Sequence, residues 1–142
     1  MAHIPCIGAI VFDEQGRLLL VKRANPPAQG KWSLPGGRLE PRETSESGVV
    51  REVREETGLA VTVVREVGTI ERDAPSGDTY VIRDFLCALS TDASDATDAT
   101  PVAADDASDA GFFALTDVID LPTSEGLLEA LRDWDLIPGS VR

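Results

Sequence analysis

The sequence predicts an α/β fold built as a single domain. Runs rich in Val, Ile and Leu are separated by turn residues, which is typical of β-strands. A helix with recognisable capping residues interrupts these runs, and an amphipathic segment follows them near the end of the chain. With 142 residues, 42% of them hydrophobic, the chain is long enough for one core and too short for two ordinary ones. We therefore expect residues 1–142 to form one domain.

The N-terminal part predicts a β-hairpin followed by a short extended piece. Residues 4–12 and 17–23 are β-rich, and Asp-Glu-Gln-Gly between them is a turn signal. Residues 24–30 form a proline-containing loop, and residues 31–37 run from Lys-Trp-Ser-Leu into a Pro-Gly-Gly breaker. Trp32 is expected to pack beneath this breaker in preference to stacking on a base.

Residues 44–57 predict a helix with signals at both ends. Thr44 is suited to cap the N-terminus, and Gly58 stands where a helix ends in a left-handed residue. Gly48 lies inside the helix and costs about 1 kcal/mol relative to alanine. Close packing against a neighbouring segment is the one reason that we can suggest for it.

The C-terminal half predicts further strands and a closing helix. Residues 61–71 and 79–89 are expected to be strands joined by a turn that contains Pro75. Residues 90–110 consist almost wholly of Asp, Ala, Ser and Thr, so we expect a flexible acidic loop over about 90–109. A strand at 111–115 and an amphipathic helix at 124–134 complete the expected order.

The charge and the rare residues exclude several classes of function. A formal net charge of −12 opposes binding to nucleic acid, because Lys and Arg must neutralise its phosphates. Cys6 and Cys87 lack the spacing of a metal site and are expected to be buried free thiols. His3 is the only histidine and lies near the terminus, which argues against serine or cysteine catalysis with an imidazole base.

The chain also lacks membrane signals. No run approaches the roughly 20 apolar residues needed to span a bilayer, and residues 1–5 lack the pattern of a signal peptide. We therefore expect a cytoplasmic protein without membrane contact. No exposed apolar stripe stands out, so the oligomeric state is left open.

Three glutamates share one face of the predicted helix. At 3.6 residues per turn, Glu52, Glu55 and Glu56 fall within an arc of about 100°, beside a mostly apolar stripe that includes Val49 and Val53. Neighbouring carboxylates repel, and Mg²⁺ is a cation that such oxygens bind well. The same residues taken alone also fit a solvated face stabilised by ion pairs.

The spacing around this helix resembles the signature of the Nudix hydrolase family. Nine specified positions fall within 23 residues, namely Gly37, Glu43, Arg51, Glu52, Val53, Glu55, Glu56, Gly58 and Leu59. Residues 18–23 and 31–37 also resemble the family's second strand and its approach to this box. After Leu59 the resemblance is one of pattern and not of motif.

The resemblance implies an α/β/α sandwich with a mixed β-sheet, in which a loop–helix–loop presents glutamates to Mg²⁺, with Mn²⁺ as a possible substitute. It implies metal binding by Glu52, Glu55, Glu56 and the carbonyl of Gly36. Glu43 lies outside the acidic arc, and in the family the corresponding glutamate pairs with the box arginine, here Arg51.

The resemblance also implies attack of water on a diphosphate linkage, assisted by a carboxylate base. Glu52 is our first choice for the base. Counting back from an aromatic residue that resembles one in MutT-like members gives Asp106 as a downstream acid, with Asp105 and Asp109 as alternatives. Arg23 is a candidate for binding a substrate phosphate, although a surface arginine on a strand is an equal alternative.

The substrate is expected to be a small nucleotide-like molecule. Pro75 lies where ADP-ribose-cleaving members carry a proline, which favours ADP-ribose slightly. The short chain equally resembles MutT-like enzymes that hydrolyse nucleoside triphosphates, including oxidised ones. A Nudix-fold binding or regulatory module without catalysis is the alternative from another class, but such modules usually have a degraded box or an added domain.

Overall fold

The computed structural model describes residues 2–26, 28–90 and 100–136. The elements follow in the order β1 His3–Phe12, β2 Leu18–Arg23, β3 Trp32–Ser33, β4 Gly36–Arg38, α1 Ser45–Thr57, β5 Val61–Asp73, β6 Thr79–Leu89, β7 Ala107–Phe113, α2 Leu115–Val118 and α3 Leu127–Asp133. Strands and helices therefore alternate as an α/β fold requires.

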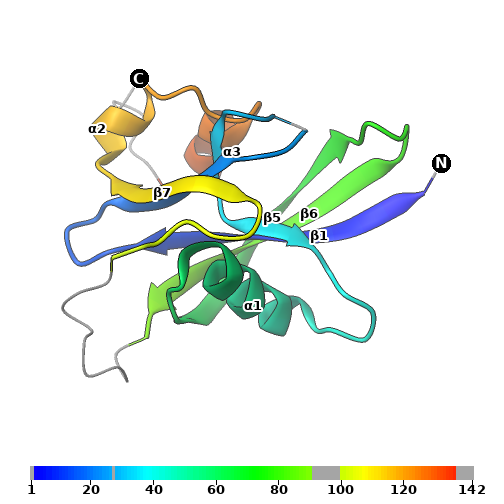
Figure 1. Cartoon of the computed structure of the whole chain (residues 1–142), viewed down its shortest axis with the longest axis horizontal. Helices are drawn as coiled ribbons and strands as arrows, with labels where there is room; N and C mark the ends of the chain where they lie inside the picture. Colours follow the sequence, from blue (N-terminus) through cyan, green and yellow to red (C-terminus); the bar gives the residue numbers. More distant parts are fainter. Residues whose placement is uncertain (1, 27, 91–99, 137–142) are drawn as a thin grey trace.

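A mixed β-sheet forms the centre of the protein. Seven strands of the described residues join one sheet, in the order β3-β2-β1-β6-β5, while β4 pairs with β1 and β7 pairs with β2. The pairing of β1 with β6 is parallel over ten residue pairs, and the other strand pairs are antiparallel. In Figure 1, α1 lies on one side of this sheet, and α2 and α3 lie on the other.

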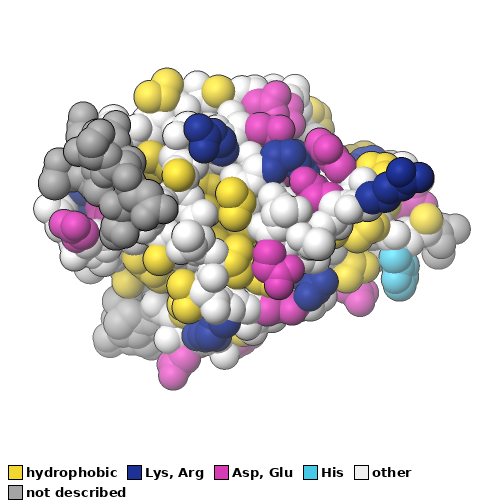
Figure 2. All heavy atoms as spheres, turned by 90° about the horizontal axis from the view of Figure 1, so that it is seen from below, with side chains coloured by type: hydrophobic (Ala, Val, Ile, Leu, Met, Phe, Trp, Pro, Cys, Tyr) yellow, Lys and Arg dark blue, Asp and Glu magenta, His cyan; other side chains and the backbone are white. Residues whose placement is uncertain are grey.

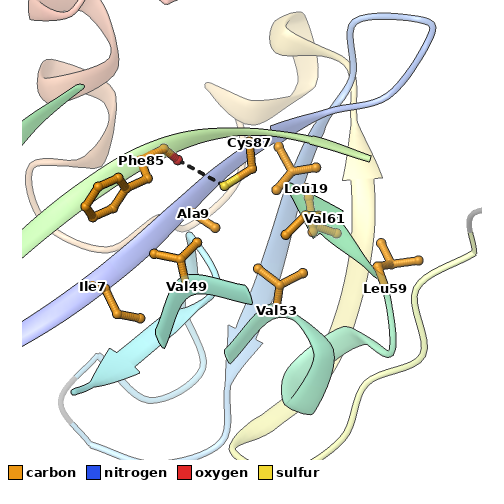
Figure 3. Packing of buried hydrophobic residues seen from close by; sticks show 10 residues of the cluster. Ile7, Ala9, Leu19, Val49, Val53, Leu59, Val61, Phe85 and Cys87 are labelled. Atoms are coloured by element: carbon orange, nitrogen blue, oxygen red, sulfur yellow. Dashed lines mark hydrogen bonds between the residues drawn. The ribbon is translucent and has the colours of Figure 1, made fainter. Parts of the chain in front are cut away.

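Each face of the sheet has its own hydrophobic core. Figure 3 shows the core under α1, where Val49 and Val53 point toward Ile7, Ala9 and Phe85 of the sheet. The opposite core joins strands β1 and β2 to α2 and α3 through a second set of side chains, which comprises Ile10, Leu18, Leu20, Trp32, Val118, Leu127 and Leu131. The protein is thus the α/β/α sandwich that the resemblance implies.

Helix α1 begins and ends at the residues expected from the sequence. The side chain of Thr44 accepts a hydrogen bond from the amide of Ser47 at 3.1 Å, which satisfies one donor of the first turn. Gly58 adopts a left-handed conformation with φ of 76° and donates to the carbonyl of Arg54. A Cβ on Gly48 would come within 2.6 Å of Leu39 and 3.0 Å of Glu43, so close packing does account for this glycine.

The predicted hairpin is formed only near its turn. Asp13 accepts from the amides of Gln15 and Arg17, and the strands pair at Phe12 and Leu18. Farther back, β1 pairs with β4 through Cys6, Ile7 and Gly8 instead. The strands therefore diverge, and the gap between them admits the segment that leads into α1.

The C-terminal boundaries differ from those expected. Strand β7 begins at Ala107 and ends at Phe113, so the prediction of a strand at 111–115 and a loop through 110 was wrong at both ends. Residues 107–110, Ala-Ser-Asp-Ala, pair with β2 although they lack the β-branched and aromatic side chains typical of strands. Residues 91–99 of the expected flexible loop lie outside the described residues, and residues 100–106 form no helix or strand.

The closing helix is shorter than expected. Helix α2 was not predicted, and α3 begins at Leu127 because Gly126 takes a left-handed conformation with φ of 83° and interrupts the segment before it. Both cysteines are free and buried, as expected, and burial raises the pKa of Cys6 to about 11 and that of Cys87 to about 12. Among the helices in the described ranges, none has the length and apolarity needed to cross a bilayer.

Removing two methyl groups at the contact between α1 and the sheet is expected to destabilise the fold. Val53 is fully buried in the core under α1, so Val53→Ala should lower the free energy of unfolding by about 2–3 kcal/mol. Val64→Ala is the matched control, because Val64 is 57% exposed and should change stability by less than about 0.5 kcal/mol. Urea unfolding measures both, and equal losses in the two variants would contradict this account of the core.

Candidate active site

A broad cleft runs along the protein beside the acidic helix. Its volume is about 1120 Å³, which is large enough for a nucleotide-sized ligand. The lining includes residues of β4 and α1, residues 6–8 of β1, the last residues of β5, residues of β6 up to Asp84, and residues 124, 125 and 127 at the start of α3. Several segments far apart in the sequence therefore meet around one space.

The three helix glutamates lie along one wall of this cleft. Glu52 and Glu56 are 8% and 4% exposed, while Glu55 is open to solvent. The side of the molecule on which α1 lies shows acidic side chains interleaved with basic ones (Figure 2). The simple alternative of a fully solvated helix face does not fit Glu52 and Glu56, because both carboxyl groups are buried.

Arg51 holds several of these carboxylates at once. Its Nε and Nη2 donate to the two oxygens of Glu43 at 2.6 and 2.9 Å, a bidentate ion pair. Its Nη1 donates to Glu52 at 2.8 Å and to Glu55 at 2.9 Å. The bond to Arg51 keeps the pKa of Glu43 below its usual range, and the bond to Glu43 is the main cause of a raised pKa of Arg51.

The Pro-Gly-Gly segment lets the main chain approach the glutamates closely. The amide of Gly36 donates to Glu56 Oε1 at 3.1 Å. A Cβ on Gly36 would collide with the carbonyl of Ile7, and one on Gly37 would lie 2.9 Å from a carboxyl oxygen of Glu52. Both positions therefore need glycine for steric reasons.

Burial and mutual repulsion disfavour the charged forms of Glu52 and Glu56. Burial raises the pKa of Glu56 to about 8, the Gly36 amide opposes this rise, and the charge of Glu52 adds to it. Burial also raises the pKa of Glu52, although the hydrogen bond from Arg51 opposes it. The two carboxyl groups are close enough for each to shift the pKa of the other. Such a pair of buried acids is stabilised when a cation joins it.

The donor chemistry of this wall fits a hard divalent cation. Within residues 2–26, 28–90 and 100–136, no group of three Asp, Glu, His or Cys side chains is already arranged to hold a metal ion. Arg51 engages Glu52 and Glu55, and Gly36 engages Glu56, so these oxygens are turned toward protein donors. Carboxylate and carbonyl oxygens are nevertheless the ligands that Mg²⁺ prefers, and the excess of acids over Arg51 favours a cation.

The other predicted site residues are divided between the cleft and the surface. Arg23 and Asp106 line the cleft. The charge of Arg23 lowers the pKa of Glu56 in part, so Arg23 lies near enough to act on that carboxyl group. Asp106 is exposed, lies 3.4 Å from the amide nitrogen of Asn25, and accepts through its main chain from Ala24. Asp109 is paired opposite Lys22 in β7 and does not line the cleft.

Two of the remaining candidates are placed away from the cleft. Pro75 lies in the exposed turn between β5 and β6, and its side chain is not part of the cleft lining, although Asp73 and Thr79 on either side of the turn are. Trp32 is buried and packs edge-to-face on Phe113 at 4.8 Å between ring centroids, as expected for a core residue.

One acidic residue of the cleft was missed from the sequence. Asp84 on β6 is 2% exposed and lies in the cleft floor, among residues that we expected to form an ordinary strand. Burial raises its pKa to about 7, and the charge of Arg72 opposes this rise. The signal was present, since a carboxylate interrupts the apolar run from Val81 to Leu89.

Comparison with known proteins places this geometry in a family. An 8-oxo-dGTP diphosphatase, described as putative, from Bacillus subtilis is 43% identical over 63 residues, which are 44% of this chain and 40% of that protein. An ADP-ribose pyrophosphatase from Methanocaldococcus jannaschii is 36% identical over 111 residues, which are 76% of this chain and 60% of that protein. The matched segments thus span less than two thirds of the length of these curated relatives.

The fold has close counterparts among solved structures. A MutT NUDIX hydrolase from Burkholderia pseudomallei superimposes with a TM-score of 0.77 and 29% sequence identity, over 93% of this chain and 98% of that one. A sequence model of the NUDIX domain matches residues 2–134. The chain therefore belongs to the NUDIX family.

Proposed function

We propose that this chain is a Mg²⁺-dependent hydrolase that cleaves the diphosphate linkage of a small nucleotide. The observation that carries the proposal is the buried pair Glu52 and Glu56, which Arg51 and Gly36 hold in the wall of a nucleotide-sized cleft. Mn²⁺ is the expected substitute for Mg²⁺.

The residues have distinct roles in this proposal. Glu52, Glu55, Glu56 and the carbonyl of Gly36 would hold the cation. When bound, Mg²⁺ supplies charge neutralisation at phosphate oxygens and lowers the pKa of coordinated water. Glu43 binds the guanidinium of Arg51 through both of its carboxyl oxygens. It is therefore assigned as a positioning residue that fixes Arg51.

Glu52 is assigned as the general base that accepts the proton of the attacking water. Its carboxyl lies between the guanidinium of Arg51 and the main chain of Gly37, so its position is fixed on two sides. A general base needs such fixed geometry before its basicity matters. Asp106 is the alternative base, because it is exposed in the cleft lining and follows a segment whose Ala104 amide donates to the main-chain carbonyl of Glu56.

Arg23 is assigned to the phosphate chain of the substrate. The charge of Arg23 lowers the pKa of Glu56 in part, so the two groups lie near each other. A phosphate bound by a cation at Glu56 would therefore lie within reach of the Arg23 guanidinium. An anionic substrate needs such a partner, because the net charge of the chain is −12.

Nucleoside triphosphates are our leading substrate class, and ADP-ribose is the second candidate. The preference for ADP-ribose rested on Pro75, whose side chain is exposed outside the cleft lining. The relative from Bacillus subtilis is named for a nucleoside triphosphate substrate, while the relative from Methanocaldococcus jannaschii, which matches more of the chain, is named for ADP-ribose. A module without catalysis is disfavoured, because all nine box positions are intact.

Activity should depend on the cation and on the buried glutamates together. EDTA should abolish hydrolysis, and Mg²⁺ or Mn²⁺ should restore it. Glu52→Gln and Glu56→Gln should each lower kcat by about 10²-fold or more, since each removes a charge but little volume. Glu46→Gln is the matched control on the same helix, because Glu46 is exposed and lies outside the cleft lining. Full turnover in EDTA, or near-normal rates in both folded variants, would refute the proposed mechanism.

The products distinguish the two substrate classes. A nucleoside triphosphate should yield a nucleoside monophosphate and pyrophosphate, whereas ADP-ribose would yield AMP and ribose 5-phosphate. We expect the higher kcat/KM with triphosphates, and Pro75→Ala should leave both values within about twofold, because the side chain does not line the cleft. If ADP-ribose is preferred and Pro75→Ala selectively raises its KM, the assignment to triphosphates is wrong.

A further inference from the structure

Asp84 lies in the cleft floor in a space made by two glycines. It is paired with Gly8 on β1 and with Gly68 on β5, so it has no Cβ-bearing neighbour on either adjacent strand. A Cβ on Gly8 would collide with Oδ1 of Asp84, and one on Gly68 would collide with the indole ring of Trp134. The floor is therefore shaped to accommodate this carboxyl group and an indole next to it.

The carboxyl group of Asp84 lacks a hydrogen-bond partner within the part of the chain that the structure describes. Among the described residues, none donates a hydrogen bond to either of its oxygens, although the residue is only 2% exposed and lines the cleft. A buried polar group without a partner is costly to the fold. The rise of its pKa to about 7 through burial is consistent with this cost. Within the described residues, the attraction of Arg72 is the one charge interaction that favours the ionised form of Asp84, and it does not outweigh the effect of burial.

The position of Asp84 relative to the glutamates follows from the strand pairing. Gly8 is paired with Asp84 on one side and with Gly36 on the other, and the amide of Gly36 contacts Glu56. Two strand spacings of about 4.8 Å put the main chain of Asp84 roughly 10 Å from that of Gly36. A nucleotide with its phosphates beside Glu56 would therefore extend its nucleoside part over Asp84.

The chemistry of a carboxylate restricts the group that it can bind there. An ionised carboxyl group only accepts hydrogen bonds, through two oxygens, and it repels phosphate. Guanine presents two adjacent N–H donors on its Watson–Crick edge, N1–H and the 2-amino group, which match the two oxygens of a carboxylate. Uracil and hypoxanthine place a single N–H on that edge, and adenine and cytosine place an acceptor beside their amino group.

We propose that Asp84 is a specificity-determining residue that accepts two hydrogen bonds from a guanine-type nucleobase edge of the substrate. This inference rests on the proposed function, because it names the base that the hydrolase selects. Gly8 belongs to the same proposed binding site, because its lack of a side chain leaves room for the carboxyl group of Asp84. An oxidised guanine that keeps N1–H and the 2-amino group would meet the same requirement.

GTP and ITP provide the matched pair of substrates, because they differ only in the 2-amino group. We expect the wild-type protein to favour GTP over ITP in kcat/KM by about tenfold or more, since ITP leaves a buried oxygen unpaired. Asp84→Asn presents one acceptor and one donor in the same volume, so the ratio should fall to within about threefold of one. Gly8→Ala, which crowds Oδ1, should lower the ratio in the same direction.

Controls separate base recognition from a structural effect. Asp120→Asn replaces an exposed aspartate outside the cleft lining and should leave the GTP to ITP ratio unchanged. The ratio of kcat/KM for GTP to that for dGTP should be the same in wild type and Asp84→Asn, because Asp84 is proposed to bind the base and not the sugar. The melting temperature of Asp84→Asn should not fall, since an unpartnered buried acid is removed.

Binding of the monophosphates GMP and IMP tests the inference independently of turnover. Wild type should bind GMP about tenfold more tightly than IMP, and Asp84→Asn should bind the two alike. Equal binding by wild type, or a GTP to ITP ratio that survives Asp84→Asn, would overturn the role of Asp84. If Asp84→Asn changed the ratio of kcat/KM for GTP to that for dGTP instead, Asp84 would bind the sugar, and its role in base recognition would be wrong. Absence of any nucleotide hydrolysis with Mg²⁺ would refute the proposed function, while the GMP and IMP comparison would still decide this inference.

Discussion

The bidentate ion pair between Arg51 and Glu43 is the constraint on which the candidate site depends. A guanidinium fixed by two short bonds has its remaining donors aimed in one direction, and here that direction is toward Glu52 and Glu55. Glu43 is supplied by the loop before α1 and Arg51 by the helix itself, so the pair also fixes how the helix follows the loop. Close approach at Gly36 and Gly37 completes the arrangement by bringing main chain against the same carboxyl groups.

The parts of this site that lie within one short segment could be predicted from the sequence. Thr44, Gly58 and the acidic face of α1 depend on helix geometry and local hydrogen bonds, which residue spacing encodes directly. The start of β7 could not be predicted in the same way. Residues 107–110 carry no residue typical of strands, and they form one because β2 offers unpaired main-chain groups beside them. That reason is visible only once the sheet has been assembled.

Long-range strand pairing also explains why Asp84 was missed in the sequence. Asp84 becomes a buried, unpartnered acid because strand pairing puts Gly8 and Gly68 on its two sides, and these residues are distant in sequence. Pro75 was chosen by counting positions along the chain, and its residue is exposed and not part of the cleft lining. Counting positions is reliable inside the helix, where the geometry is regular, and it does not show which residues become neighbours across turns and strands.

A double-mutant cycle on Glu43 and Arg51 tests the central claim most directly. The rates kcat/KM of Glu43→Gln, Arg51→Gln and the double variant are compared with wild type at saturating Mg²⁺, after thermal unfolding has verified that all are folded. If Glu43 acts only through Arg51, the double variant should be no slower than Arg51→Gln, so the two losses are strongly non-additive. Additive losses would mean that the two residues act independently, and the ion pair would then not be what positions Glu52.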